Sequence, residues 1–131
     1  MKSFTTYITE KMVYTKANKP VYKYHPKTKE ELREIIKECI KNEGSECDLN
    51  DIDVSEITDM SHLFYYSKFN GDISNWDVSN VTTMDWMFAN SNFNGDISKW
   101  KLNNNCKTKD MFNNCPLKNQ PEKWPQNYKR N

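Results

Sequence analysis

The sequence predicts an α/β fold: a short solenoid of 24-residue strand-turn-helix units that follows an N-terminal strand-helix cap. The phrase FNGDIS begins at Phe69 and begins again at Phe93. Apolar residues recur at the same step in several columns, and a period of about 20 to 29 residues is the length of one solenoid coil. A hydrophobic share of 36% in 131 residues also favours a thin, layered structure over a thick globular core.

Residues 1–19 are predicted to form an amphipathic N-terminal segment and a linker. Apolar residues recur at Phe4, Tyr7, Ile8 and Met12, and the polar stretch TKANKP follows them. Two interpretations stay open for this segment. It packs as a helix on the next part of the chain, or it docks into a groove of a partner through these four residues.

Residues 20–46 are predicted to form the N-terminal cap of the solenoid. The stretch VYKYH, residues 21–25, reads as a strand. Thr28 and Glu31 have the spacing of a capping box, which predicts that a helix begins there, and Gly44 offers its end. One face of this helix is apolar, with Leu32, Ile35, Ile36, Cys39 and Ile40.

Residues 47–119 are predicted to form three repeats. In the second repeat the apolar spacing predicts a strand near residues 76–78. Thr82 and Asp85 resemble a helix cap, and Met84, Met87 and Phe88 then fall on one helical face. Asn-Gly pairs at 70–71 and 94–95 are expected to turn the chain with positive φ.

Residues 120–131 are predicted to be a partial fourth repeat and a basic tail. A column of large side chains runs through all four units, and its first member is aliphatic, so we expect a buried stack: Ile52, Trp76, Trp100 and Trp124. The third repeat departs from the pattern, as a terminal coil that faces water would.

These motifs carry a family resemblance. The phrases DISNWDVSNVTTMDWMF, FNGDISKW and DVSEITDMSHLF resemble the BspA-like leucine-rich repeats of bacterial surface proteins, also described as DUF285 or the mycoplasma lipoprotein-associated repeat. The resemblance covers residues 47–124. It implies a leucine-rich-repeat-like fold and adhesion or binding to partner macromolecules, and it brings no catalytic motif.

The net charge of +1 hides an uneven distribution of charge. Residues 1–44 carry ten basic and six acidic side chains. Residues 45–98 carry one basic and ten acidic side chains, and residues 99–131 carry eight basic and two acidic side chains. An acidic block between basic ends argues against a nucleic-acid binder with one continuous basic face. No apolar run is long enough to cross a bilayer.

The N-terminus MKSFTTYITEKMV lacks the apolar core of a cleavable signal peptide. We therefore expect the chain to be cytoplasmic in the producing cell or associated with a virion, and the lack of a cleavable signal puts surface display in doubt. Cysteines 39, 47, 106 and 115 are interpreted as reduced and structural. They contain no C-x-x-C pair, so neither a zinc site nor any other metal or cofactor site is predicted.

No catalytic motif is present, so an enzyme is not expected. Asp72 and Asp96 are interpreted as structural residues that accept hydrogen bonds in turns. The acidic stretch from Asp48 lacks the glycine that an EF-hand loop requires. No small-molecule substrate is predicted either.

One column does suggest a binding surface. The residues at positions 62, 86 and 110 have no shared apolar character, whereas those of the two following columns are apolar. The column of positions 62, 86 and 110 is therefore expected to face solvent. Trp86 would then be exposed beside two tyrosines of the preceding repeat, and exposed aromatic residues are typical anchors for protein partners. The predicted partner-binding residues are His62, Tyr65, Tyr66 and Trp86.

Two functions fit these observations. The first is a non-catalytic interaction module that binds one protein, with a phage or mobile element as a candidate source. The second is a structural or cargo component of a larger assembly, a virion or a cell surface, tethered through the N-terminal segment. Charge at equivalent positions also changes from acidic to basic along the repeats. The change either relieves repulsion between like charges in one column or allows the acidic end of one molecule to associate with the basic end of another.

Overall fold

The computed structural model describes residues 21–130. Within them the chain forms one α-helix, α2 (Lys29–Glu43), and two short 3-10 helices, η1 (Pro116–Asn119) and η2 (Pro121–Lys123). No β-strand is formed in this part of the chain. The predicted α/β solenoid of strand-turn-helix units is therefore wrong.

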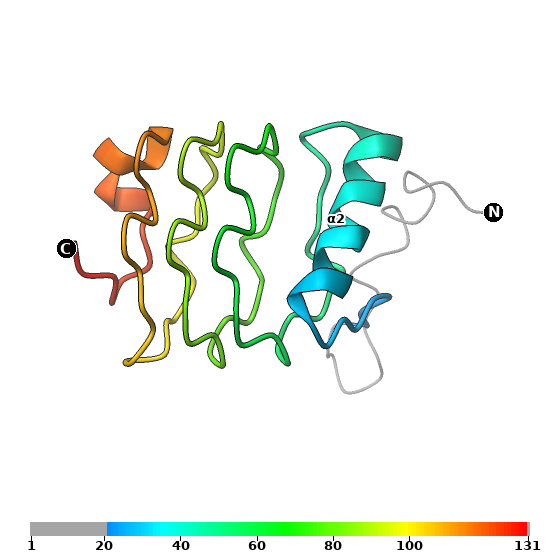
Figure 1. Cartoon of the computed structure of the whole chain (residues 1–131), viewed down its shortest axis with the longest axis horizontal. Helices are drawn as coiled ribbons and strands as arrows, with labels where there is room; N and C mark the ends of the chain where they lie inside the picture. The colour runs from blue at the N-terminus through cyan, green and yellow to red at the C-terminus, as the bar shows by residue number, and fades with distance from the viewer. Residues whose placement is uncertain (1–20, 131) are drawn as a thin grey trace.

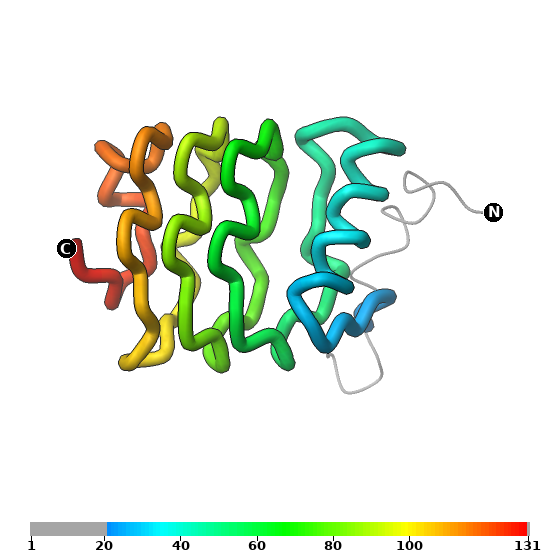
Figure 2. Tube along the Cα trace, in the orientation of Figure 1, coloured from blue at the N-terminus to red at the C-terminus, as the bar shows by residue number. Residues whose placement is uncertain are grey.

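Figure 1 shows a row of narrow coils that lie side by side, with α2 at one end of the row and the C-terminal residues at the other. We refer to residues 47–70 as coil 1, residues 71–94 as coil 2 and residues 95–118 as coil 3. The trace in Figure 2 follows the same course in each coil. Neighbouring coils therefore present equivalent residues to one another, 24 positions apart, as in the parallel bridge between Asp48 and Asp72.

Helix α2 forms where local signals predict it. The Thr28 side chain accepts a hydrogen bond from the N–H of Glu31, and the Glu31 carboxylate accepts one in return, which completes the capping box. The helix ends at Gly44, whose φ of 91° few other residues adopt. Its apolar face packs on the coils and buries Leu32, Ile36 and Cys39. The prediction of this helix and of its capping residues is confirmed.

Two predicted strands are replaced by turns and single bridges. Near residues 76–78 the backbone turns twice, because Trp76 N–H donates to Ile73 O and Val81 N–H donates to Val78 O. The expected strand at residues 21–25 is reduced to one parallel bridge between Tyr24 and Ile52. Neighbouring coils within residues 21–130 are joined by isolated bridges of this kind, such as the one between Thr83 and Lys107.

The predicted helix over Met84, Met87 and Phe88 is a run of tight turns instead. Met87 N–H donates to Met84 O, three residues back, whereas the amides on either side of it bond to coil 3. In the interior of an α-helix each amide donates to the carbonyl four residues back in the same helix. Apolar residues at i, i+3 and i+4 suit both arrangements, because the two arrangements bury the same side of the chain.

In each coil, two residues four positions apart have a left-handed backbone. The φ angles are 60° at His62, 56° at Tyr66 and 59° at Trp86, and three further residues share the conformation: Asn90, Asp110 and Asn114. A positive φ at the third residue of a turn defines type II, a position that favours Gly or Asn. The turns therefore place non-glycine residues in a conformation that costs about 1 kcal/mol or more each.

The Asn-Gly pairs do not play the predicted role. Among the glycines of residues 21–130, a positive φ occurs only at Gly44, so the expectation of positive φ at Gly71 and Gly95 is wrong. A Cβ atom at Gly71 would instead collide with the carbonyl of Cys47, and one at Gly95 would lie 2.7 Å from the Phe93 ring. These glycines allow close packing of the backbone.

The core consists of stacked equivalent side chains. Phe64 lies parallel to Phe88 with ring centroids 5.5 Å apart, and Trp76 lies parallel to Trp100 at 6.3 Å. The indole N–H of Trp76 donates to Leu49 O, and that of Trp100 donates to Ile73 O, each at 2.9 Å. Ile52, Trp76 and Trp100 are buried, which confirms the predicted stack at these positions, and Trp124 is partly buried.

Candidate protein-docking face

The four residues predicted to bind a partner lie together on the tandem turns of coils 1 and 2. We call them the aromatic cluster: His62, Tyr65, Tyr66 and Trp86. The imidazole of His62 lies parallel to the indole of Trp86, with centroids 6.4 Å apart. Tyr65 meets His62 edge-on at 5.1 Å and Tyr66 at 4.6 Å. Each ring therefore has at least one ring neighbour within the cluster.

The tyrosines of this cluster face solvent. Tyr66 is 69% exposed and Tyr65 is 39% exposed. Within residues 21–130, the only other large hydrophobic side chain so exposed is Val21, at 46%. His62 is also exposed, whereas Trp86 is half-buried. An exposed group of rings on an ordered backbone is the composition typical of interface anchors.

The backbone beneath the cluster is held by the next coil. His62 N–H donates to Asp85 O at 3.0 Å, and Tyr66 N–H donates to Ala89 O at 3.1 Å. One coil further along, Trp86 N–H donates to Lys109 O at 2.8 Å. The rings therefore stand on residues whose amides are already bonded, so docking would require little ordering of the backbone.

Helix α2 borders the cluster and supplies positive charge at its edge. Arg33 donates from Nη2 to His62 O at 3.4 Å, and Lys29 Nζ contacts Ser61 O at 3.2 Å and the carboxylate of Asp59 at 3.3 Å. Burial alone would raise the pKa of Asp59, but hydrogen bonds from Ser61 and Lys29 hold that pKa below its ordinary value. Asp59 therefore stays ionised as a structural group.

Two further acidic residues of the coils, Asp72 and Asp96, are held in local turns. Asp72 accepts from Ser74 N–H at 2.9 Å and from its hydroxyl at 2.7 Å, and Asp96 accepts from Ser98 N–H at 2.9 Å. The Ser98 hydrogen bonds lower the pKa of Asp96. The prediction that Asp72 and Asp96 accept turn hydrogen bonds is confirmed. Across residues 21–130, no group of three or more His, Cys, Asp or Glu side chains is arranged to hold a metal ion.

The four cysteines are free thiols, and three of them are buried. Burial raises the pKa of Cys106 to about 11 and raises that of Cys115, and a hydrogen bond with Cys47 is the main cause of the raised pKa of Cys39. Raised pKa values leave these groups protonated and poorly nucleophilic near neutral pH. The second predicted docking set, Phe4, Tyr7, Ile8 and Met12, lies outside the described residues.

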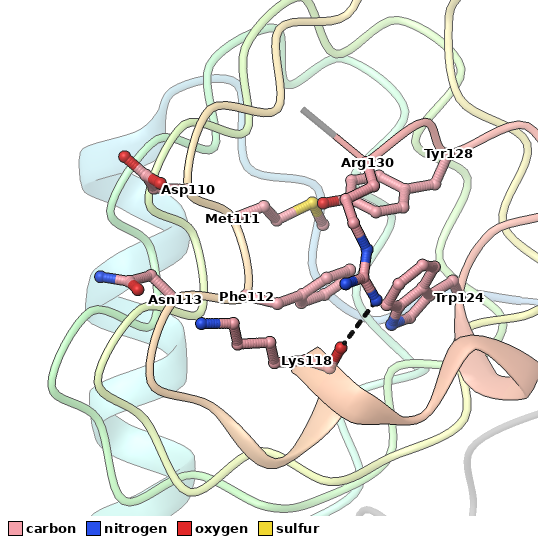
Figure 3. Close-up of a pocket in the computed structure, with 8 residues that line it drawn as sticks. All are labelled: Asp110, Met111, Phe112, Asn113, Lys118, Trp124, Tyr128 and Arg130. Carbon is pink, nitrogen blue, oxygen red and sulfur yellow. Dashed lines mark hydrogen bonds between the residues drawn. The ribbon is translucent and has the colours of Figure 1, made fainter.

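A second feature, at the C-terminal end of the row, was missed from the sequence. A cavity of about 230 Å³ lies there. Figure 3 shows the ring of Phe112 beside Trp124, with Tyr128 above them. The guanidinium of Arg130 covers the Trp124 ring at 4.9 Å and donates to Lys118 O at 3.3 Å. Burial raises the pKa of Tyr128.

No helix within residues 21–130 combines the length and the apolar character needed to cross a bilayer. No curated protein and no solved structure matches the chain. One family model matches residues 30–130, more than three quarters of the chain, and its description is "Mycoplasma protein of unknown function, DUF285". The resemblance seen in the repeated motifs is thereby confirmed, and the chain belongs to the DUF285 family.

Proposed function

We propose that this protein is a non-catalytic interaction module that binds one partner protein through the aromatic cluster of His62, Tyr65, Tyr66 and Trp86. The observation that carries the proposal is the contact between these four rings, of which Tyr65 and Tyr66 are exposed. Tyr and Trp are the side chains that most often dominate the free energy of protein binding. Tyr66 is the central anchor because it is the most exposed of the large hydrophobic residues described.

The charge around the cluster indicates the chemistry of the partner. Residues 45–98 carry ten acidic side chains and one lysine, so the coils beneath the cluster are acidic. A complementary surface would offer an apolar side chain to the rings and basic side chains around it. Arg33 lies at the α2 edge of the cluster and would repel basic side chains of the partner on that side. This repulsion would set the orientation of the partner.

Affinity capture with matched variants tests this function. The full-length protein, immobilised through a tag, is compared with Tyr66→Ala, with Trp86→Ala and with Lys68→Ala, in which an exposed coil 1 side chain outside the cluster is shortened. A partner bound by the wild type should be bound equally by Lys68→Ala. We expect each aromatic variant to lose at least about tenfold in affinity for it.

Circular dichroism of each variant shows whether the fold is retained. A partner that binds Tyr66→Ala and Trp86→Ala as tightly as the wild type would contradict the proposal. Loss of the same partner from all three variants would contradict it too, because the effect would then not depend on the rings.

A further inference from the structure

Two of the four thiols contact each other at the junction between α2 and coil 1. Cys39 lies near the C-terminal end of α2, and Cys47 is the first residue of coil 1. Their side chains are hydrogen-bonded to each other, and both belong to the same buried cluster, with 0% and 4% of their surface exposed. We call them the junction pair. Two thiols that already touch need only a small approach to form a disulfide.

The backbone around the junction pair holds the two residues in place. Helix α2 stops where Gly44 N–H donates to Ile40 O at 2.9 Å, and in the turn that follows Cys47 N–H donates to Gly44 O at 3.3 Å. Coil 2 holds the far side of this turn, because Asp72 N–H donates to Cys47 O at 3.3 Å. These bonds belong to the main chain, so the two side chains can be joined without breaking them.

The other two cysteines show that sequence spacing alone does not produce such a contact. Cys106 and Cys115 lie nine residues apart, and the members of the junction pair lie eight apart. The Cys115 thiol, however, donates to Phe93 O at 3.3 Å and accepts from Ser91 Oγ at 3.7 Å. The Cys106 thiol donates to Lys107 O at 3.7 Å. These two thiols are therefore bonded to other groups, and the chain contains its own matched control for the junction pair.

Access of an oxidant decides which thiol of the junction pair reacts first. The hydrogen bond between the thiols and burial raise the pKa of Cys39 well above its ordinary value, so this thiol is a poor nucleophile in the closed fold. Cys47 directly follows the surface turn, in which Gly44 and Glu46 are exposed. Opening of this short turn would bring Cys47 to solvent while Cys39 stays in the helix.

We propose that Cys39 and Cys47 are a disulfide-forming pair, which a small-molecule disulfide such as oxidised glutathione converts into a covalent link between α2 and coil 1. The Cys47 sulfur loses its proton and attacks one sulfur of the oxidant, and a mixed disulfide forms as one thiolate leaves. The Cys39 sulfur then loses its proton, attacks Cys47 Sγ and displaces the second thiolate. The two thiolates take up the two protons, so the protein gives two electrons and the oxidant becomes two thiols.

The link has a structural consequence. It closes a short loop and restricts the unfolded chain, so the oxidised protein should be more stable than the reduced one. It also fixes α2 on the coils, and this helix carries Arg33 beside the aromatic cluster. The junction pair is separate from that cluster, and its oxidation does not depend on the function proposed there.

Oxidation of the full-length native protein tests the pair. The protein is incubated with oxidised glutathione at pH 8 and then unfolded in urea with iodoacetamide, which marks every remaining thiol. Mass spectrometry after trypsin should show a bond between two peptides, residues 38–41 and 42–68, and none between Cys106 and Cys115. The oxidised protein should melt at a temperature higher by roughly 5 °C or more, and a phosphine reductant should abolish the difference.

Variants and an unfolded sample serve as controls. Cys47→Ala should lose both the cross-link and the rise in melting temperature, whereas Cys115→Ala should keep both. Each variant is compared with its own reduced form, so a loss of stability caused by the alanine itself does not affect the result. Oxidation in concentrated urea should give a mixture that also joins Cys106 to Cys115, because the fold no longer separates these thiols.

Three results would overturn the proposal. The first is a native protein that still has four alkylatable thiols after many times the period that completes oxidation in urea. The second is native protein in which Cys106 is joined to Cys115 as often as the junction pair is joined. The third is an oxidised protein that contains the predicted bond but melts at the same temperature as the reduced protein, since the bond would then not hold α2 on the coils.

Discussion

The imidazole of His62 lies over the indole of Trp86, one coil away, with centroids 6.4 Å apart and ring planes 3° apart. The two residues also share a left-handed backbone, with φ angles of 60° and 59°. Equivalent positions on successive coils therefore have the same backbone geometry and contact one another. This relationship explains how residues far apart in the sequence form one aromatic surface, and it determines how substitutions at these positions should behave.

Tyr66→Gly should be more stable than Tyr66→Ala. Both changes remove the ring, but alanine keeps a Cβ that disfavours the φ of 56° at this position, so the glycine variant should exceed the alanine variant by about 1 kcal/mol. In a helix that ran through this residue the order would be reversed, because alanine is the better helix former. Urea unfolding followed by circular dichroism measures the difference. Greater stability of the alanine variant would argue for a helix and against the turns.

Gly71→Ala should destabilise the fold strongly. The new Cβ would meet the Cys47 carbonyl and lie 2.6 Å from the Phe69 ring, so the backbone of two coils must separate, at a cost of about 2 kcal/mol or more. Gly44→Ala is the matched control, since nothing lies within 4 Å of its Cβ and only the φ of 91° opposes it. Thermal unfolding of both variants checks the order. Equal losses would contradict the close approach of Gly71 to the Cys47 carbonyl.

Ser61→Ala should destabilise the protein more at pH 7 than at pH 2, where the hydrogen bond from Lys29 to the Ser61 hydroxyl is still lost. Although burial opposes ionisation, Ser61 and Lys29 hold the pKa of Asp59 below 3.8, so this carboxylate contributes stability above its unfolded pKa and loses it as pH falls through the folded value. Removing the Ser61 hydroxyl should bring the folded pKa back toward 3.8. Carboxyl titration by NMR gives the pKa, and urea unfolding at both pH values gives the stability. An unchanged Asp59 pKa would refute this account.

The native thiols should react slowly with iodoacetamide at pH 8. Cys39, Cys47 and Cys115 are buried, and Cys106, which is only partly buried, has a pKa of about 11 because of burial. Cys106 should therefore be modified first, and its rate should rise as pH approaches 11. Mass spectrometry of the intact protein and of its peptides follows the reaction. Rapid modification of Cys39 at pH 8, before any loss of circular dichroism signal, is the outcome that the structure does not allow.

Local signals predicted α2 correctly, and periodicity predicted the buried tryptophan stack. The capping box of Thr28 and Glu31 and the stop at Gly44 act within a few residues, so they can be read without knowledge of the rest of the fold. The turns could not be separated from helices by apolar spacing, because both bury residues at i, i+3 and i+4. Another column held the missing signal: Tyr66, Asn90 and Asn114 are equivalent, and Asn is one of the few residues that tolerate a left-handed backbone.

The candidate site was predicted in part. The absence of apolar character in the column of His62, Trp86 and Asp110 indicated a surface position, and the structure brings the first two of these residues together with Tyr65 and Tyr66. That they bind a partner stays a prediction. Which backbone amides donate to the next coil could not be predicted. The direction of an amide is set by the turn type, which the apolar pattern does not reveal.

Site-specific photo-crosslinking from position 66 tests the central claim most directly. A photoreactive benzophenone amino acid replaces Tyr66 in one version of the full-length protein and the exposed Lys101 in another, and both are irradiated with a partner that the wild type binds. We predict a covalent adduct from position 66 and none from position 101, because Tyr66 is the most exposed ring of the cluster. Adducts from position 101 alone would place the partner elsewhere on the coils and contradict the account.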